Sequence, residues 1–271
     1  MELTDILYTK SEGLATITIN RPQFLNAFRR QTVVELNQAF TDAEEDPEVG
    51  VVILTGAGDR AFCVGGDATE WGPSGYAGAN WATIGLPIVK LHEVIRQLPK
   101  PVIGAVNGYA IGGGNVLQVL CDLVIASRTA RFGQVGPKVG SFDAGFGSAY
   151  LARLVGERKA REIWFLCRQY SAPEALEMGL INAVVEPEDL MPEAERWARE
   201  MLDKSPTALK MLKASFNADT DHILGITNLA MGALALYYAT AEAVEGHAAF
   251  QERRTPQFGG FRAAPGREAS P

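Results

Sequence analysis

Short apolar runs rich in β-branched residues alternate with segments in which apolar residues recur every three or four positions. The apolar runs predict strands at 14–20, 49–56, 100–108 and 121–127. The later runs are almost continuously apolar, which is typical of strands covered on both faces. Segments 30–46 and 88–99 place charged residues opposite an apolar side, which predicts helices. Because strands and helices alternate, we expect an α/β fold.

The pattern changes after about residue 150. Helical spacing dominates from there, and several segments begin with Ser or Pro, which are common at helix starts. The predicted helices are 157–167, 172–179, 191–204, 205–217 and 223–254. The stretch 229–238 is too apolar for a solvated helix, so we expect it to pack against the body or another subunit. We divide the chain into an α/β core (1–200), a helical C-terminal region (201–261) and a disordered tail (262–271).

Composition narrows the class of protein. The 271 residues are 47% hydrophobic and 21% charged, as in an ordinary globular protein. The net charge of −7 and the lack of a basic stripe argue against nucleic-acid binding. The N-terminal segment carries acids where a signal peptide carries basic residues, and no apolar run reaches the about 18 residues of a membrane span. We therefore expect a cytoplasmic protein without membrane contact.

Neither cysteines nor histidines predict a metal site. The three cysteines are far apart and lack the spacing of a zinc site or a disulfide framework. The three histidines are scattered along the chain, so we interpret them as packing or surface residues.

Two glycine clusters are the candidate chemistry. "AFCVGGDA" (61–68) follows a predicted strand, and "GYAIGGGNVL" (108–117) opens a predicted helix. Glycines let backbone N–H groups approach a ligand, and a helix N-terminus adds unsatisfied donors, so such a site stabilises an anion. Tight turns and close packing are the alternative explanation. The order of the second cluster is not that of a dinucleotide fingerprint, and the sequence has no P-loop motif.

Together, "INRPQFLNAF", "RAFCVGGDA", "KPVIGAVNGYAIGGGNVLQVLCDLVIAS" and "ARFGQVGPKVGS" resemble the crotonase (enoyl-CoA hydratase/isomerase) superfamily over about residues 5–260. The resemblance implies a spiral of ββα repeats with a helical C-terminal trimerisation region, assembled as a trimer or a hexamer. It also implies an acyl-CoA substrate, of which coenzyme A is a part. The backbone N–H groups of Gly66 and Gly113 then form an oxyanion hole for the thioester carbonyl.

Enoyl-CoA hydratases of this superfamily carry two glutamates, and the matching positions here are Val116 and Gly136. Without either carboxylate, ordinary hydration lacks its acid/base pair. Segment 133–172 instead resembles the branch of 2-ketocyclohexanecarboxyl-CoA hydrolase and 1,4-dihydroxy-2-naphthoyl-CoA synthase. That resemblance assigns catalytic roles to Asp143, Ser141 and Tyr238. Taken alone, an aspartate such as Asp143 is more often a turn former or helix cap, and Tyr238 is by default a core or interface tyrosine.

The resemblance also implies contacts to the substrate. Arg253 would lie near the CoA phosphates, and Tyr76 would lie in an active-site loop. If the protein is synthase-like, Gln134 and Trp164 would hold a bicarbonate. Alternatively, these two side chains simply pack in the protein. The remaining predicted substrate or CoA contacts are Phe24, Leu25, Ala27, Val64, Gly65, Asp67, Ala68, Tyr109, Ile111, Gly112, Val135 and Gly136. No other cofactor and no metal are predicted.

Segments 83–103 and 215–222, together with Asn115 where the synthase usually has His, look more like the hydrolase. We therefore expect an enzyme that adds water to a 2-ketocycloalkane carboxyl-CoA and cleaves the ring through a thioester enolate. The alternatives are the ring-closing synthase, a generic enoyl-CoA hydratase/isomerase and a non-catalytic acyl-CoA-binding protein.

Overall fold

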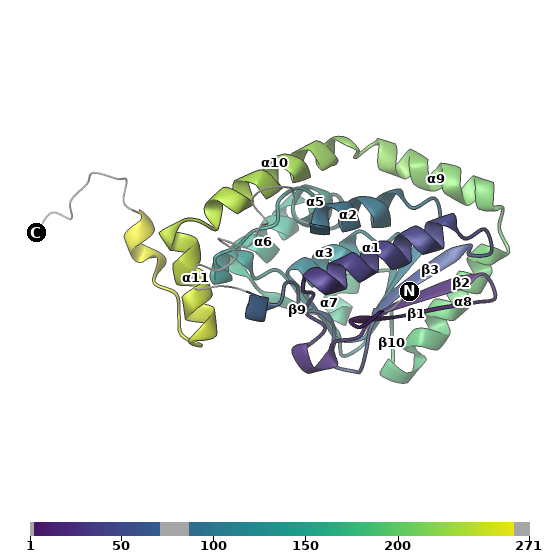
Figure 1. The fold of residues 1–271 in the computed structure, drawn as a ribbon, viewed down its shortest axis with the longest axis horizontal. Helices are drawn as coiled ribbons and strands as arrows, with labels where there is room; N and C mark the ends of the chain where they lie inside the picture. Colours follow the sequence, from purple (N-terminus) through teal and green to yellow (C-terminus); the bar gives the residue numbers. More distant parts are fainter. Residues whose placement is uncertain (1–2, 71–86, 263–271) are drawn as a thin grey trace, which may run out of the picture.

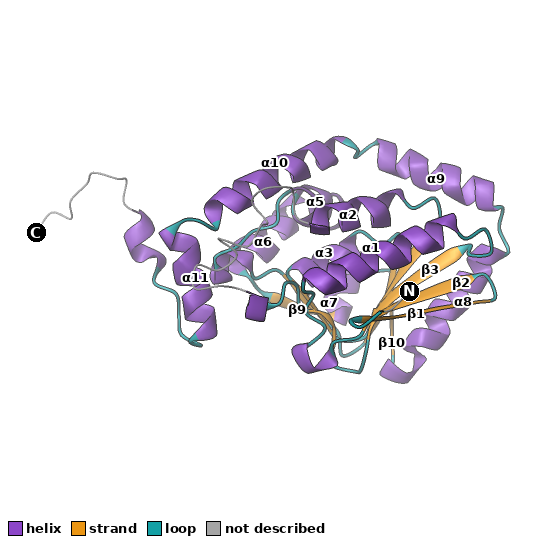
Figure 2. Ribbon diagram, viewed as in Figure 1, coloured by secondary structure: helices purple, strands orange, loops and turns teal. Residues whose placement is uncertain are grey.

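The computed structural model describes residues 3–70 and 87–262. A sheet of six strands forms its centre, in the order β1-β2-β3-β5-β7-β10 (Figures 1 and 2). β1 is antiparallel to β2, and all the other neighbours are parallel. The strands are β1 (Ile6–Ser11), β2 (Leu14–Ile19), β3 (Val51–Gly56), β5 (Val102–Val106), β7 (Leu123–Ser127) and β10 (Ala183–Val185). The four predicted strands are confirmed as β2, β3, β5 and β7, with trimmed ends.

A second sheet has four short strands in the order β4-β6-β8-β9. They are β4 (Ala61–Cys63), β6 (Tyr109–Ile111), β8 (Arg131–Gly133) and β9 (Gln169–Ser171). β3, β5 and β7 each lead into the next strand of this second sheet and then into a helix: α2 (Pro87–Gln97), α3 (Gly113–Val119) or α4 (Gly136–Val139). The chain thus advances through successive strand–strand–helix units, which confirms the expected ββα repeat.

Both faces of the central sheet are buried. Alternate residues of β3 face two different cores: Val52 and Leu54 pack on the α1 (Arg30–Glu45) side, and Ile53 packs on α8 (Leu190–Leu202). Such strands need apolar residues at every position, and this explains their continuous apolar pattern.

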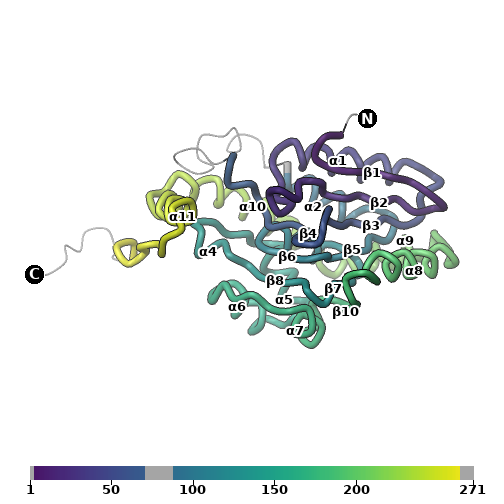
Figure 3. The backbone as a smooth tube through the Cα atoms, turned by 90° about the horizontal axis from the view of Figure 1, so that it is seen from below, coloured from purple at the N-terminus to yellow at the C-terminus, as the bar shows by residue number. Residues whose placement is uncertain are grey.

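Helices also cover the C-terminal half, namely α5 (Ala149–Val155), α6 (Glu157–Leu166), α7 (Ala172–Glu177), α9 (Pro206–Ala218), α10 (His222–Tyr237) and α11 (Ala241–Gln251), with a final turn at Phe258–Arg262. α9 and α10 run along one side of the molecule, and α11 lies at one end of it, as Figures 1 and 3 show. The strands β9 and β10 in this half were not predicted, because three-residue strands are too short for a periodic pattern.

The prediction of one helix over 223–254 was wrong. The chain breaks after Tyr237, and α10 and α11 meet at a bend of 79°. Thr240 has extended backbone angles and accepts the N–H of Ala243, so a Thr N-cap begins a new helix there. We call residues 238–240 the elbow. Within the described residues no single helix is long and apolar enough to cross a membrane, and only the bent pair α10 and α11 passes that test together.

Candidate active site

The two glycine clusters meet in space. β4 and β6 pair in parallel, so the turns that follow them lie side by side. A Cβ atom placed at Gly65 would lie 3.0 Å from the backbone nitrogen of Gly113, and Gly65 has a φ of 90° that favours glycine. A Cβ at Gly114 would lie only 1.9 Å from the carbonyl oxygen of Cys63. Glycine is therefore required here by close backbone approach as well as by a strained turn.

This contact brings two backbone donors to one place. Gly113 is the first residue of α3, so its N–H has no partner within the helix. Gly66 pairs with Phe28 in an isolated parallel bridge, in which Phe28 N–H donates to Gly65 O at 2.8 Å and Asp67 N–H donates to Phe28 O at 2.9 Å. Within the described residues, neither Gly66 N–H nor Gly113 N–H donates a hydrogen bond to a protein acceptor, and both glycines are partly exposed. The pair can serve a ligand oxygen.

Asp67 supports this arrangement from behind. It is 3% exposed, and its Oδ2 lies 2.7 Å from Arg21 Nη2. Its Oδ1 accepts hydrogen bonds from the N–H and hydroxyl of Thr69. Burial raises the pKa of Asp67, but the bonds from Thr69 and Arg21 outweigh it and hold the pKa below its ordinary value. The carboxylate is thus engaged within the protein, beside the donor residue Gly66.

The two positions of the hydratase glutamates cannot supply acids. Val116 is fully buried in α3. A Cβ at Gly136 would lie 2.7 Å from the carbonyl oxygen of Ser141 and 3.1 Å from the Cα of Phe142. The backbone of the segment that carries Asp143 therefore fills the space where a side chain at residue 136 would begin.

Asp143 is the acid that this segment carries. The residue is half-buried, yet its Oδ1 is shielded and has no hydrogen-bond partner among the described residues. Burial raises the pKa of Asp143 to about 7, and the backbone N–H of Gly147 offsets this only in part. A carboxyl group that titrates near neutral pH suits proton transfer.

Ser141 and Tyr238, to which the resemblance assigned catalytic roles, lie next to each other. Their hydroxyl oxygens lie 2.8 Å apart. Tyr238 stands at the elbow and is 6% exposed. Behind it, a Cβ at Gly246 of α11 would lie 2.3 Å from the backbone nitrogen of Gly140, so α11 packs directly on the 140–143 loop. The elbow thus directs Tyr238 toward the loop that carries Ser141 and Asp143.

Gln134 and Trp164 differ in their surroundings. Gln134 is 1% exposed, and neither amide atom has a hydrogen-bond partner among the described residues. Trp164 on α6 is 8% exposed and donates its indole N–H to Gly147 O at 2.6 Å.

The residues predicted to contact CoA differ in their exposure to solvent. Phe24 is 43% exposed, with the Arg21 guanidinium 4.7 Å from its ring centre, and Tyr109 is 40% exposed. Arg253 is exposed just after α11. Leu25, Val64, Ala68, Gly112 and Val135 are partly exposed, whereas Ala27 and Ile111 are buried. Tyr76 lies outside the described residues, as does the tail beyond Arg262.

Sequence reasoning missed three supporting residues. Arg21 holds Asp67, and Gly147 lies against Asp143. The ring of Phe28 would lie 2.7 Å from a Cβ at Gly113. Arg21 belongs to the motif "INRPQFLNAF" and Gly147 to segment 133–172, but nothing in the sequence shows which carboxylate each one meets.

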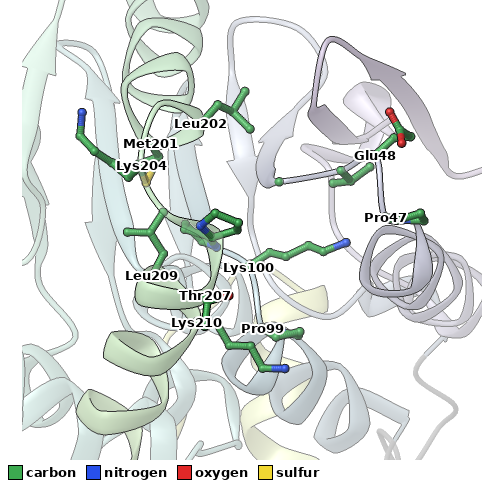
Figure 4. A pocket seen from close by; sticks show the side chains of 14 residues that line it. Pro47, Glu48, Pro99, Lys100, Met201, Leu202, Lys204, Thr207, Leu209 and Lys210 are labelled. Atoms are coloured by element: carbon green, nitrogen blue, oxygen red, sulfur yellow. The ribbon is translucent and has the colours of Figure 1, made fainter.

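A separate cavity of about 440 Å³ is lined by residues from 47–50, 99–101 and 201–210, as Figure 4 shows. It lies at the amino ends of β3 and β5, whereas the glycine clusters follow their carboxyl ends. Ligands of parallel sheets bind at the carboxyl ends, so this cavity does not belong to the glycine site. No group of His, Cys, Asp and Glu that could hold a metal lies within 3–70 and 87–262.

The fold is that of the crotonase enzymes, which act on acyl-CoA thioesters. The chain belongs to the enoyl-CoA hydratase/isomerase family, whose model matches residues 9–261. A solved enoyl-CoA hydratase from Mycobacterium avium subsp. paratuberculosis K-10 is 32% identical, with 95% of this chain and 99% of that chain covered and a TM-score of 0.85.

Other solved structures are similar over nearly their whole length. An enoyl-CoA hydratase/isomerase from Xanthobacter autotrophicus Py2 is 30% identical, with 93% and 94% of the two chains covered and a TM-score of 0.81. A methylmalonyl-CoA decarboxylase in complex with 2-nitronate-propionyl-CoA is 26% identical, with 95% and 99% covered and a TM-score of 0.81. Enzymes that bear different reaction names thus share this fold.

Proposed function

We propose that the chain adds water to the ring ketone of a 2-ketocycloalkane carboxyl-CoA and opens the ring. The observation that carries this proposal is the contact between Gly136 and the Ser141 backbone, which replaces a hydratase glutamate with the loop bearing Asp143. Since Val116 is also buried, Asp143 is the carboxyl group at the site with a pKa near neutrality. One acid suffices because the oxyanion hole lowers most of the barrier.

The reaction begins with the thioester oxygen between the N–H groups of Gly66 and Gly113. The Asp143 carboxylate takes a proton from water, and the hydroxide equivalent attacks the ring ketone. The bond between the former ketone carbon and the α-carbon breaks, and its electron pair forms a thioester enolate held by the two N–H groups. Asp143 returns the proton to the α-carbon, directly or through the Tyr238 hydroxyl. The product is a linear dicarboxylic acid mono-CoA ester.

Three substrates separate the candidate reactions. Purified protein is incubated with 2-ketocyclohexanecarboxyl-CoA, o-succinylbenzoyl-CoA or crotonyl-CoA, and the CoA esters are weighed by mass spectrometry. Ring opening adds one water to the first ester, and the synthase reaction removes one water from the second. Hydration of crotonyl-CoA alone would overturn the proposal in favour of a plain hydratase, and turnover of none of the three would favour the non-catalytic alternative.

We propose in addition that the protein is a homo-oligomer, a trimer or hexamer. Large apolar side chains stand exposed along α9 and α10: Met211, Leu212, Phe216, Ile226, Leu229 and Leu236. An apolar surface of this kind is typical of a subunit contact. Light scattering after size exclusion should show a multiple of the 29.2 kDa chain, and Leu229→Asp, at a side chain that is 78% exposed, should reduce that mass without unfolding the chain.

A further inference from the structure

Trp164 is not one of the proposed reacting groups, but its indole N–H is hydrogen-bonded to the segment that holds Asp143. The bond to Gly147 O is 2.6 Å long and buried. An indole has a single N–H and no acceptor. The indole N–H therefore donates to the backbone carbonyl of Gly147 and is not available to an anion.

Gly147 in turn forms the surface on which the Asp143 carboxyl group rests. A Cβ at Gly147 would lie 2.8 Å from Asp143 Oδ1 and 2.9 Å from its Cγ. Among the groups that the structure describes, the N–H of Gly147 lowers the pKa of Asp143 against the effect of burial. Moving Gly147 would therefore move the carboxyl group and change its titration.

The short turn η4 (Gly145–Gly147) has other anchors, which hold its first two residues. Gly145 N–H donates to Ser148 Oγ at 3.1 Å, and Phe146 N–H lies 3.3 Å from Thr227 Oγ1. The carbonyl of Gly147 is held by Trp164. The indole thus sets the orientation of the last residue, which is the one against Asp143.

We infer that Trp164 is a positioning residue, which holds the Asp143 carboxyl group in place through Gly147. The inference rests on the proposed catalytic role of Asp143. It replaces the anion-holding role that the family resemblance implied for Trp164, and it leaves the unpartnered amide of Gln134 to contact the substrate or water.

The test is a direct titration of the Asp143 carboxyl group by carbon NMR, in protein labelled with ¹³C at aspartate side chains. The Asp143→Asn variant identifies the resonance. Trp164→Phe keeps an aromatic ring and removes the donor. Trp197→Phe is the matched control, because Trp197 also donates its indole N–H, to Glu193 Oε1 at 2.8 Å, but on the remote helix α8.

In the wild type the midpoint should lie near pH 7. Trp164→Phe should raise it by about half a unit or more, because the Gly147 N–H, which favours the charged form, is no longer held beside the carboxylate. On an acyl-CoA that the wild type turns over, kcat should fall about 10- to 100-fold, as for a misplaced reacting group, while KM stays within about twofold. Trp197→Phe should change neither quantity.

The NMR measurement needs no substrate, so it separates this inference from the proposed function. An unchanged midpoint in a folded Trp164→Phe protein overturns the inference even where ring opening is observed. Bicarbonate that stimulates the wild type but not Trp164→Phe, with an unchanged midpoint, would instead assign Trp164 to anion binding. If Trp164→Phe does not fold, benzothienylalanine at residue 164 replaces the N–H with sulfur at almost the same shape, and the same shift is expected.

Discussion

The hydroxyl oxygens of Ser141 and Tyr238 lie 2.8 Å apart although 97 positions separate the two residues in the chain. The bend at the elbow makes this contact, because it turns the end of α10 inward before α11 begins. The tyrosine next to it, Tyr237, packs instead on Phe142, with ring centres 5.5 Å apart. Two adjacent tyrosines thus offer a matched pair for experiment.

Tyr238→Phe should lower kcat about 10-fold or more, the scale of a lost proton-transfer partner, with little change in KM. The ring remains, so the melting temperature should be close to that of the wild type. Tyr237→Phe should keep both kcat and stability. Full activity of the Tyr238→Phe protein would show that the contact between the Ser141 and Tyr238 hydroxyl groups serves packing and not catalysis.

Asp143→Asn should lower kcat at least about 100-fold, since the variant has no base. The wild-type rate should rise with pH and level off above an inflection near 7, the raised pKa of Asp143. A pH–rate profile of the wild type checks this directly. A profile that is flat between about pH 5 and 8 would exclude Asp143 as the base.

The same carboxyl group affects stability. Its pKa is higher in the folded chain than in the unfolded chain, so the folded state binds the proton more tightly, and stability falls as the pH rises from about 4 to about 7. Asp143→Asn removes this dependence. Its melting temperature should exceed that of the wild type at about pH 8, and the gap should close below about pH 4. A variant less stable than the wild type at pH 8 would contradict a raised pKa of the buried Asp143 carboxyl group.

Gly113→Ala should abolish most activity while the protein remains folded. A Cβ at this residue would lie 2.7 Å from the end of the Phe28 ring, so the ring or the Gly113 backbone must shift, and a shift of the backbone displaces the N–H donor. Losing one such donor costs about 100- to 1,000-fold in kcat. Gly225→Ala on α10 is the control, because within the described part of the chain, its own helix turn aside, no atom lies within 4 Å of a Cβ placed there. Measuring melting temperature, oligomer mass and turnover on one sample separates a lost donor from a lost fold.

Asp5→Asn tests the buried ion-pair cluster behind the glycine site. Asp5 accepts two hydrogen bonds of 2.7 Å from Arg29 and one from Thr32, and these bonds hold its pKa below the ordinary value. A lowered pKa stabilises the fold above pH 3.8 and loses that effect as the pH falls through the folded pKa. The variant should therefore be less stable than the wild type at neutral pH, and the difference in unfolding free energy should shrink in acid. Denaturant unfolding at several pH values measures it.

The sequence predicted most of the central sheet, because strands such as β3 are buried on both faces and read as continuous apolar runs. The second sheet was not predicted, since β4, β6 and β8 contribute only three residues each and their pairing depends on turns that bring distant segments together. The glycine clusters were recognised from composition, but only the structure shows that Gly65 approaches Gly113.

The elbow shows why local patterns fail in the C-terminal region. Apolar residues recur from 223 to 250 with no proline between them, and nothing in their spacing marks a bend. Thr240 ends the pattern by capping α11, and threonine is common enough in helices that its capping role shows only in the backbone angles. The contact between Gly147 and Asp143 likewise follows from a turn geometry that no motif encodes.

The close approach of Gly246 to Gly140 also has a consequence for biosynthesis. The strands of the central sheet end at β10, so a chain still attached to the ribosome can complete this sheet before α11 has left the exit tunnel. The Asp143 loop meets α11, and Ser141 meets Tyr238, only after residues 238–246 have also left the tunnel. A nascent chain can thus have a complete central sheet while the contacts around the Asp143 loop are still missing.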